Sequence, residues 1–216
     1  MALQAVLWDM DGTLVSTESL WMIAETTTME SFGGHWDAQD QAVSVGGPAD
    51  RVLRYMAARV GRSEQEVGER LIGEMEQLMA ATTIEMLPGV RELHDEVTAA
   101  GIPQALVSNS WRSLMESALA ELDTSFDVVI AGDEVERGKP DPLPYLLAAE
   151  ALGVEPGAGV VIEDSASGVA AGIAAGATVV GVPHVGELTP NPQLTVLPSL
   201  QGLTLARLAE LVDSGR

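Results

Sequence analysis

Five short apolar runs constrain the fold of this chain more than any other feature. Each has the length of a buried strand, and helix-like segments separate them. The runs span residues 5–8, 104–107, 128–131, 160–162 and 178–182. Continuous apolar strands that alternate with helices are typical of a parallel sheet covered by helices. We therefore expect an α/β fold with a parallel sheet.

Helices and loops are predicted around these strands from local patterns. Apolar residues recur at helical spacing in three segments, 90–100, 143–152 and 205–212. The stretch Pro183 to Pro198 contains four prolines and one glycine, so we expect it to be a loop.

One segment, from about Ser16 to Ala81, interrupts the alternation of strands and helices. It has three helix-like pieces, 18–31, 49–59 and 64–79, and no strand candidate. A capping box, from Ser63 to Glu66, opens the third piece. We predict a catalytic core of residues 1–15 and 82–216, and an inserted all-helical cap of residues 16–81. The two connections between these parts are natural hinges for a lid.

Composition excludes several classes of protein. The 216 residues carry a formal charge of −21, which argues against nucleic-acid and anionic-membrane binding. The sequence has no cysteine, so disulfides and thiol catalysis are excluded. We find neither a signal peptide nor an apolar run of membrane-spanning length. We expect a cytoplasmic monomer that binds neither nucleic acid nor membrane.

Two carboxylates, Asp9 and Asp11, directly follow the first apolar run, and Gly12 lets the backbone turn there. In parallel sheets of this kind ligands bind at the carboxyl ends of the strands. Asp9 can attack phosphorus as a nucleophile, while Asp11 donates a proton to the leaving oxygen and later takes one from water. Acidic residues in such turns are also often plain helix caps.

Polar residues also follow the second apolar run, and a single lysine lies in a constrained loop further along the chain. Ser108 and Asn109 come after the run 104–107, where a hydroxyl, an amide and backbone N–H groups can seat an anion, or merely cap a helix. Lys139 lies between a glycine and a proline in a chain with only 11 basic residues. It can neutralise charge on a phosphoryl group, or can be a solvated loop residue.

The last pair, Glu163 and Asp164, ends an apolar strand, with Ser165 or Ser167 available to cap the next helix. Acids buried at a sheet edge are costly unless a cation compensates their charge. A site of oxygen ligands without histidine or cysteine favours Mg²⁺.

The four clusters, taken in order, resemble the motifs of the haloacid dehalogenase-like hydrolase superfamily, and the resemblance covers essentially the whole chain. The helical insertion is similar to the cap of the beta-phosphoglucomutase-like and sugar-phosphatase branch, and Leu87 to Val90 resemble its return to the core. The resemblance implies a Rossmann-like sheet. It also implies that Asp9 forms an aspartyl-phosphate and that Asp11 is the general acid and base.

The same resemblance implies the ligands of the phosphate and the metal. Ser108 and Lys139 hold the transferring phosphate, with Asn109 alongside. Mg²⁺ lies on the Asp9 side chain, the Asp11 backbone carbonyl and Asp164, with Glu163 a direct or water-mediated ligand.

Branch-specific residues select the reaction. The dehalogenases lack an acid at the position of Asp11 and need no metal, so we reject dehalogenation. At the link between core and cap, where this branch often has a carboxylate, the chain has Ser16. At the position where the family commonly has phenylalanine, the chain has Trp8. The cap histidine and arginine of the mutases have no clear counterpart. Arg51 and Arg54 can face the active-site mouth or simply offset acidic surface.

These departures favour Mg²⁺-dependent hydrolysis of a small phosphate monoester, a sugar phosphate, over a phosphoglucomutase. A non-catalytic phosphometabolite-binding protein is the third possibility, but every motif residue is present.

Overall fold

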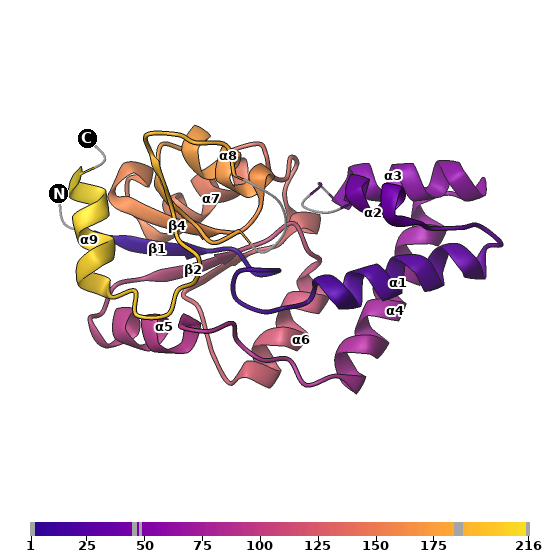
Figure 1. Ribbon diagram of the computed structural model, residues 1–216, viewed down its shortest axis with the longest axis horizontal. Helices are drawn as coiled ribbons and strands as arrows, with labels where there is room; N and C mark the ends of the chain where they lie inside the picture. The colour runs from indigo at the N-terminus through magenta and orange to yellow at the C-terminus, as the bar shows by residue number, and fades with distance from the viewer. Residues whose placement is uncertain (1–2, 45–46, 48, 184–187, 215–216) are drawn as a thin grey trace.

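A six-stranded parallel sheet forms the centre of the computed structural model, which describes residues 3–44, 47, 49–183 and 188–214 (Figure 1). The strand order is β3-β2-β1-β4-β5-β6. The strands are β1 (Ala5–Trp8), β2 (Gln104–Val107), β3 (Val128–Ile130), β4 (Gly159–Glu163), β5 (Thr178–Gly181) and β6 (Leu194–Val196). All five predicted strands are confirmed, and the order places β1 and β4 side by side with Trp8 opposite Ile162.

The sixth strand, β6, corrects the sequence analysis, which assigned Pro183 to Pro198 to a loop. Within that stretch, Leu194 to Val196 pair with β5 in parallel, while residues 184–187 lie outside the described residues. The prolines lie outside the three paired residues, so the strand keeps its backbone donors. A three-residue strand at a sheet edge is too short to show an alternating pattern in the sequence.

Helices cover both faces of the sheet, as its continuous apolar strands require. Val6 and Trp8 pack against one face with α5 (Val90–Ala99), α6 (Arg112–Leu122) and α9 (Leu205–Ser214). Leu7 belongs to the other face, with α7 (Leu143–Leu152) and α8 (Ala166–Ala174). Short 3₁₀ turns, Gly132–Glu134 and Pro156–Ala158, complete this part of the chain.

Every named element among the described residues between β1 and α5 is a helix, and these helices project from one end of the sheet (Figure 1). Two isolated bridges, of Val15 with Asp11 and with Met86, lie where the chain leaves the sheet and returns to it. It holds α1 (Glu18–Ser31), α2 (Ala38–Ser44), α3 (Ala49–Val60) and α4 (Glu64–Ala81). We expected three helices; α2, with only seven residues, was missed. The capping box at Ser63 and Glu66 is present. Because α4 packs on both α1 and α6, its buried face joins the two parts of the molecule.

Trp8 is buried without strain because the chain supplies a partner for its indole. Its Nε1 donates to Oε1 of buried Gln104 at 2.9 Å. The Gln104 amide in turn donates to the hydroxyl of Thr98 at 2.8 Å. A tryptophan at this strand position is therefore accommodated by polar groups on β2 and α5.

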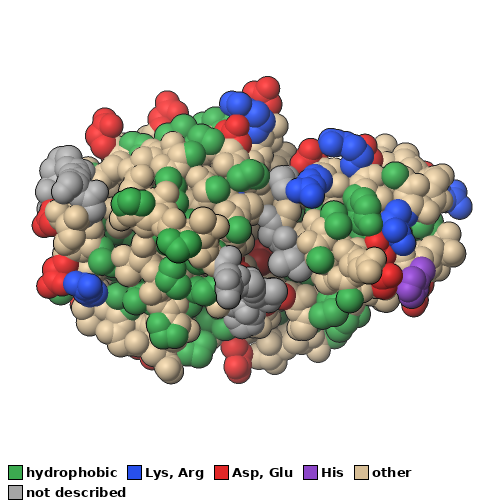
Figure 2. Space-filling model, turned by 45° about the horizontal axis from the view of Figure 1, so that its top comes forward, with side chains coloured by type: hydrophobic (Ala, Val, Ile, Leu, Met, Phe, Trp, Pro, Cys, Tyr) green, Lys and Arg blue, Asp and Glu red, His purple; other side chains and the backbone are tan. Residues whose placement is uncertain are grey.

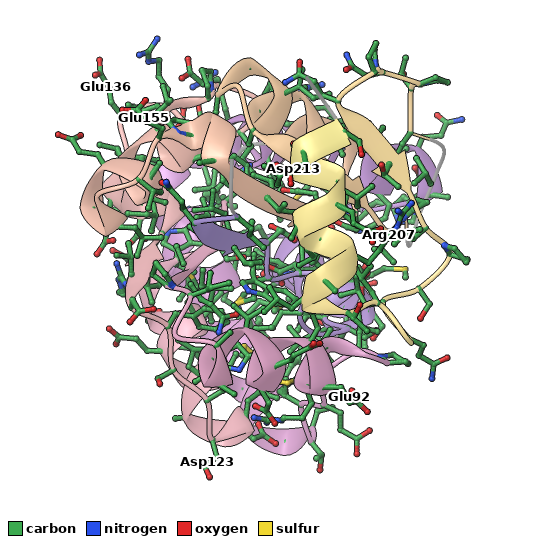
Figure 3. All side chains as sticks on the ribbon, turned by 90° about the vertical axis from the view of Figure 1, so that its left-hand side faces the viewer. Glu92, Asp123, Glu136, Glu155, Arg207 and Asp213 are labelled. Atoms are coloured by element: carbon green, nitrogen blue, oxygen red, sulfur yellow. The ribbon has the colours of Figure 1, made fainter. Side chains whose placement is uncertain are left out.

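Charge is distributed unevenly over the surface. Acidic side chains point outward around the sheet-bearing part of the molecule, among them Glu92, Asp123, Glu136, Glu155 and Asp213 (Figure 3). Five of the eleven basic residues lie in the segment 16–81, and Figure 2 shows basic side chains gathered over the helical part of one face. No helix among the described residues is long and apolar enough to cross a bilayer.

Candidate active site

Asp9 and Lys139 form a buried ion pair where β1 ends. Lys139 Nζ donates to Asp9 Oδ1 at 2.7 Å, to Glu163 Oε1 at 2.7 Å and to the Val107 carbonyl at 2.8 Å. The lysine side chain is 2% exposed. Burial alone would lower the pKa of Lys139, but the carboxylates of Asp9 and Glu163 outweigh it, and the pKa is raised. Lys139 is therefore a fixed cation.

The loop that carries Lys139 is held by Asn109. The Lys139 backbone N–H donates to Asn109 Oδ1 at 2.9 Å, and Asn109 Nδ2 donates to the Lys139 carbonyl at 3.2 Å. Gly138 allows this approach, because a Cβ there would lie 2.6 Å from Asn109 Oδ1. The Asn109 side chain thus engages the lysine loop. The Ser108 hydroxyl, by contrast, faces Asp11 across the site at 3.3 Å.

Glu163 is completely buried, and hydrogen bonds reach both of its carboxylate oxygens. Oε1 accepts from Lys139 Nζ and from the Tyr145 hydroxyl, the latter at 2.8 Å. Oε2 accepts from the Asp164 and Ser165 backbone N–H groups at 3.1 Å and from the Ser165 hydroxyl at 3.0 Å. Helix α8 passes so close that a Cβ on Gly168 would lie 1.6 Å from Glu163 Oε1. Glu163 therefore fixes the lysine and the turn after β4.

Asp9 and Asp164 are crowded carboxylates with raised pKa values. Burial and then the charge of Glu163 raise the pKa of Asp9 to about 7. Burial and then the charge of Asp9 raise the pKa of Asp164 to about 9. Oxygens of Asp9, Glu163 and Asp164 lie within 4.8 Å of one another. Gly12, with φ of +82°, is required here, because a Cβ would lie 2.3 Å from Asp164 Oδ2.

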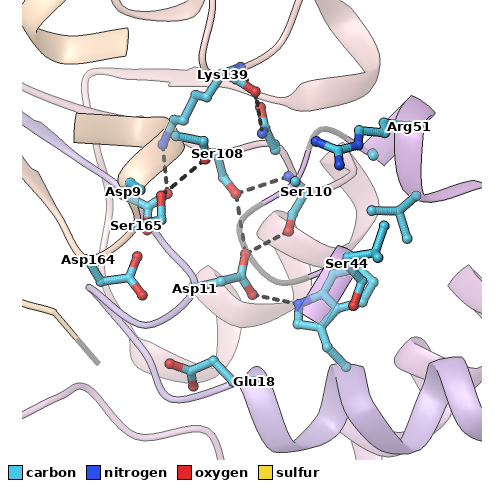
Figure 4. A pocket seen from close by; sticks show the side chains of 18 of the residues that line it. Asp9, Asp11, Glu18, Ser44, Arg51, Ser108, Ser110, Lys139, Asp164 and Ser165 are labelled. Carbon is cyan, nitrogen blue, oxygen red and sulfur yellow. Dashed lines mark hydrogen bonds and ion pairs between the residues drawn. The ribbon is translucent and has the colours of Figure 1, made fainter. Parts of the chain in front are cut away.

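Asp11 accepts hydrogen bonds from two parts of the chain (Figure 4). Oδ1 accepts from the Thr17 hydroxyl and from Trp21 Nε1, the latter at 2.9 Å. Oδ2 accepts from the Ser110 hydroxyl at 2.6 Å and more weakly from that of Ser108. Trp21 also lies 6.1 Å, centroid to centroid, from the ring of Trp111. The helical segment and the sheet-bearing part of the chain therefore meet at the carboxylate of Asp11.

These side chains line one cavity of about 490 Å³ between the sheet and the helical segment. Its sheet side includes Asp9, Asp11, Ser108, Asn109, Lys139 and Asp164, and its helical side includes Glu18, Trp21, Glu25, Gln41, Ser44 and Arg51. Arg54 instead pairs with Asp50 on the surface at 3.1 Å. A volume of this size suits a small organic ligand.

The structure brings all the predicted site residues to this cavity or its immediate floor. Glu163 supports the floor from beneath, while Ser165, and not Ser167, caps α8 by accepting from Gly168 N. Among the contributors that the sequence analysis missed are Tyr145 and Glu25. Tyr145 was detectable as a polar hydroxyl within the apolar helix 143–152. Glu25 falls on the buried face of α1 with Leu20, where an acid is out of place.

Comparison with known proteins agrees with this geometry. The sequence matches the haloacid dehalogenase-like hydrolase family over residues 6–182. Hexitol phosphatase B of Escherichia coli is 35% identical over 96% of this chain and 93% of its own length. A phosphorylated carbohydrates phosphatase of Thermotoga maritima is 35% identical over 84% of this chain and 86% of its own.

A solved structure shares the whole fold. CbbY from Rhodobacter sphaeroides in complex with phosphate superposes with a TM-score of 0.85 at 28% identity, covering 96% of this chain and 99% of that one. CbbY has also been solved with xylulose 1,5-bisphosphate. The chain therefore belongs to the haloacid dehalogenase-like hydrolase family, in the branch of the sugar phosphatases and beta-phosphoglucomutases.

Proposed function

We propose that the protein hydrolyses the phosphate monoester of a small sugar or polyol, with Mg²⁺, through an aspartyl-phosphate on Asp9. The observation that carries this proposal is the pairing of a buried nucleophile with a fixed cation. Asp9 and Lys139 meet at 2.7 Å on the floor of the cavity, and Asp11 lies two residues beyond Asp9. Two of the similar proteins support this proposal by their names, a phosphorylated carbohydrates phosphatase and a hexitol phosphatase.

The residues present fit a divalent cation. Asp9 Oδ2 is buried without a hydrogen-bond partner, and the acidic oxygens of Asp9 and Asp164 lie close together. Oxygen donors of this kind suit Mg²⁺. We propose that Asp9, Asp164 and the Asp11 carbonyl hold it, and that Glu163, already engaged by Lys139, acts behind them. When bound, the ion would supply positive charge beside the phosphoryl oxygens.

The proposed reaction has two displacements at phosphorus. In the first, an Asp9 carboxylate oxygen forms a bond to phosphorus while the bond from phosphorus to the substrate oxygen breaks, and Asp11 gives that oxygen a proton. In the second, Asp11 takes a proton from water as the water oxygen bonds to phosphorus and the bond to Asp9 breaks. Lys139 offsets negative charge, and the Ser108 hydroxyl can donate to a phosphoryl oxygen.

Residues 16–81 are proposed to act as a cap, over a core of residues 1–15 and 82–216. The cavity lies between these two parts, and Thr17 and Trp21 of the cap contact Asp11 of the core. A ligand that enters the cavity must therefore pass between them. Movement at the two connections would open and close the site.

Two alternatives use the same residues differently. A phosphoglucomutase would return the phosphoryl group to a second hydroxyl of the sugar, and Arg51 in the cavity wall is the feature that favours it, because it can bind a second phosphate. A binding protein without activity would need no nucleophile. The intact pairing of Asp9 with Lys139 favours an enzyme.

The decisive experiment measures phosphate release from p-nitrophenyl phosphate and from sugar phosphates by wild-type protein and Asp9→Asn. We expect the variant to lose at least about 10³-fold in kcat, because the neutral amide cannot attack phosphorus. EDTA should abolish wild-type activity and excess Mg²⁺ should restore it. Wild-type rates in Asp9→Asn would refute the proposal. An isomerised sugar phosphate formed without free phosphate would instead establish the mutase.

A further inference from the structure

Glu25 is a buried carboxylate in the cap wall of the cavity, outside the proposed catalytic set. The residue lines the cavity from α1 and is 4% exposed. Its neighbour Ser44 lies on the side of the pocket away from Asp9, as does Arg51 (Figure 4). Glu25 therefore faces the part of the cavity that a substrate would fill with the end remote from its phosphoryl group.

The contacts of Glu25 leave it only partly compensated. Trp36 Nε1 donates to Oε2 at 3.1 Å, and the Ser44 hydroxyl donates to Oε2 at 3.0 Å. The Gln41 side chain is a third, neutral hydrogen-bond partner of this carboxyl group. No ion pair to Glu25 is found among the described residues, although Arg51 lines the same cavity. A buried acid with neutral partners lowers stability, so packing alone gives no reason for a carboxylate here.

The surrounding side chains form a polar recess around this carboxylate. The single N–H of Trp36 is shared between Glu25 Oε2 and Gln41 Oε1, each 3.1 Å from Nε1, which holds the Gln41 amide beside Glu25. The Gln41 carbonyl lies 2.9 Å from Ser44 Oγ, so the single hydroxyl hydrogen of Ser44 is shared between that carbonyl and Glu25. Hydrogen-bond acceptors held in this way match the hydroxyl groups of a sugar or polyol, because a carboxylate forms strong, charge-assisted bonds with O–H donors.

We propose that Glu25, with Ser44 and Gln41, binds the hydroxyl groups at the distal end of the substrate, so that the enzyme selects polyol and sugar monophosphates over bisphosphates. The inference rests on the proposed function and deepens it. A second phosphate near Glu25 would meet a negative charge in a poorly solvated recess, where repulsion costs more than it does in water.

Arg51 opposes the effect of Glu25, because its positive charge would attract a second phosphate. It lines the same wall and its guanidinium is the kind of group that binds a second phosphate. However, Arg51 is exposed, so water weakens its attraction for an anion, whereas Glu25 is buried. The buried charge therefore dominates the selection, and a bisphosphate is expected to be the poorer substrate.

The test compares kcat/KM for three probes: sorbitol 6-phosphate, fructose 1,6-bisphosphate and p-nitrophenyl phosphate, which has no hydroxyl tail. Wild type, Glu25→Gln and the control Glu30→Gln are measured with Mg²⁺ at pH 8, where Glu25, whose pKa burial raises to about 7, is ionised. Glu30 lies on the same helix but is exposed and outside the cavity. In Glu25→Gln we expect the kcat/KM for sorbitol 6-phosphate, divided by the kcat/KM for p-nitrophenyl phosphate, to fall roughly 10-fold, because one charge-assisted hydrogen bond is lost. In the same variant, kcat/KM for fructose 1,6-bisphosphate should rise relative to the values for the other two probes.

The possible results distinguish a failure of the role proposed for Glu25 from a failure of the proposed phosphatase function. An unchanged substrate ratio in Glu25→Gln, with wild-type activity on p-nitrophenyl phosphate, would overturn the inference and leave the proposed function intact. A wild-type preference for the bisphosphate that disappears in Arg51→Gln would also overturn it. Wild-type protein inactive on all three probes would remove the proposed function itself. If Glu25→Gln does not fold, Glu25→Asp, which retracts the carboxylate by one methylene, should lower the same ratio.

Discussion

The buried carboxyl of Glu25 should make the stability of the folded protein depend on pH. Burial raises the pKa of Glu25 to about 7, although hydrogen bonds from Ser44, Trp36 and Gln41 oppose the rise. In the unfolded chain a glutamate has a pKa of about 4.3. The unfolded chain therefore releases its proton first as the pH increases. The contribution of protonated Glu25 is fully present below the unfolded pKa and is lost as the pH rises through the folded one.

The size of the effect follows from this difference in pKa. A separation of roughly two and a half pH units, at about 1.4 kcal/mol each, lowers the free energy of unfolding by about 3.5 kcal/mol at pH 8 relative to acidic pH. Most of that loss occurs above pH 5. The variant Glu25→Gln keeps the shape of the side chain but cannot ionise. Any cost of seating its amide is independent of pH. The stability of Glu25→Gln relative to wild type should therefore rise by about 2–3 kcal/mol between pH 5 and pH 8.

Urea unfolding at both pH values measures this difference directly. Saturating Mg²⁺ is added throughout, so that the protonation of Asp9 and Asp164 contributes little. Glu30→Gln, on the exposed side of the same helix, serves as the control and should show a difference from wild type that does not change with pH. If the relative stability of Glu25→Gln is the same at pH 5 and pH 8, then burial does not raise the pKa of Glu25, and the electrostatic reasoning is wrong.

Three further predictions concern the floor of the site. Lys139→Met leaves Asp9 and Glu163 buried without their cation, so urea unfolding should show a loss of about 3–5 kcal/mol, and kcat should fall at least about 100-fold. Gly168→Ala forces a methyl group onto Glu163; thermal unfolding should show a loss of about 1–3 kcal/mol, and activity should fall with it. Because the pKa values of Asp9 and Asp164 are raised, metal-free protein loses stability as the pH rises, so the increase in Tm caused by Mg²⁺ should be larger at pH 8 than at pH 6.

The sequence predicts the sheet well because its signals are local. Each predicted strand is a continuous apolar run, and a run such as Ala5 to Trp8 is buried on both faces only in a parallel sheet. Since parallel strands end at a common edge, acids and hydroxyls that follow β1, β2 and β4 are brought together by topology alone. The encounter of Asp9, Asp11 and Ser108 was therefore predictable without any knowledge of tertiary contacts.

What the sequence could not predict depends on contacts between distant segments. The strand β6 is defined by pairing with β5, and the short helix α2 by packing within the helical segment, so neither has a strong pattern of its own. Tyr145 becomes part of the site only because α7 packs on β1, β2 and β3, from where its hydroxyl reaches Glu163 at the end of β4. Asn109 could be placed at the site but not oriented, because its partner is the backbone of Lys139, thirty residues away.

The charge of the site explains how a protein with a formal charge of −21 can accept an anionic substrate. Surface charges are screened within about 10 Å, so the local balance decides. Three carboxyl groups, those of Asp9, Glu163 and Asp164, lie around the single ammonium of Lys139, which gives a formal balance of −2 when all three are ionised, before Asp11 is counted. All three described bonds of that ammonium already go to protein oxygens, so Lys139 alone cannot attract a phosphate. We infer that a divalent cation, which offsets the negative charge of these carboxylates, is a condition for substrate binding as well as for catalysis. Mg²⁺ should therefore be needed for binding even in Asp9→Asn, which cannot react.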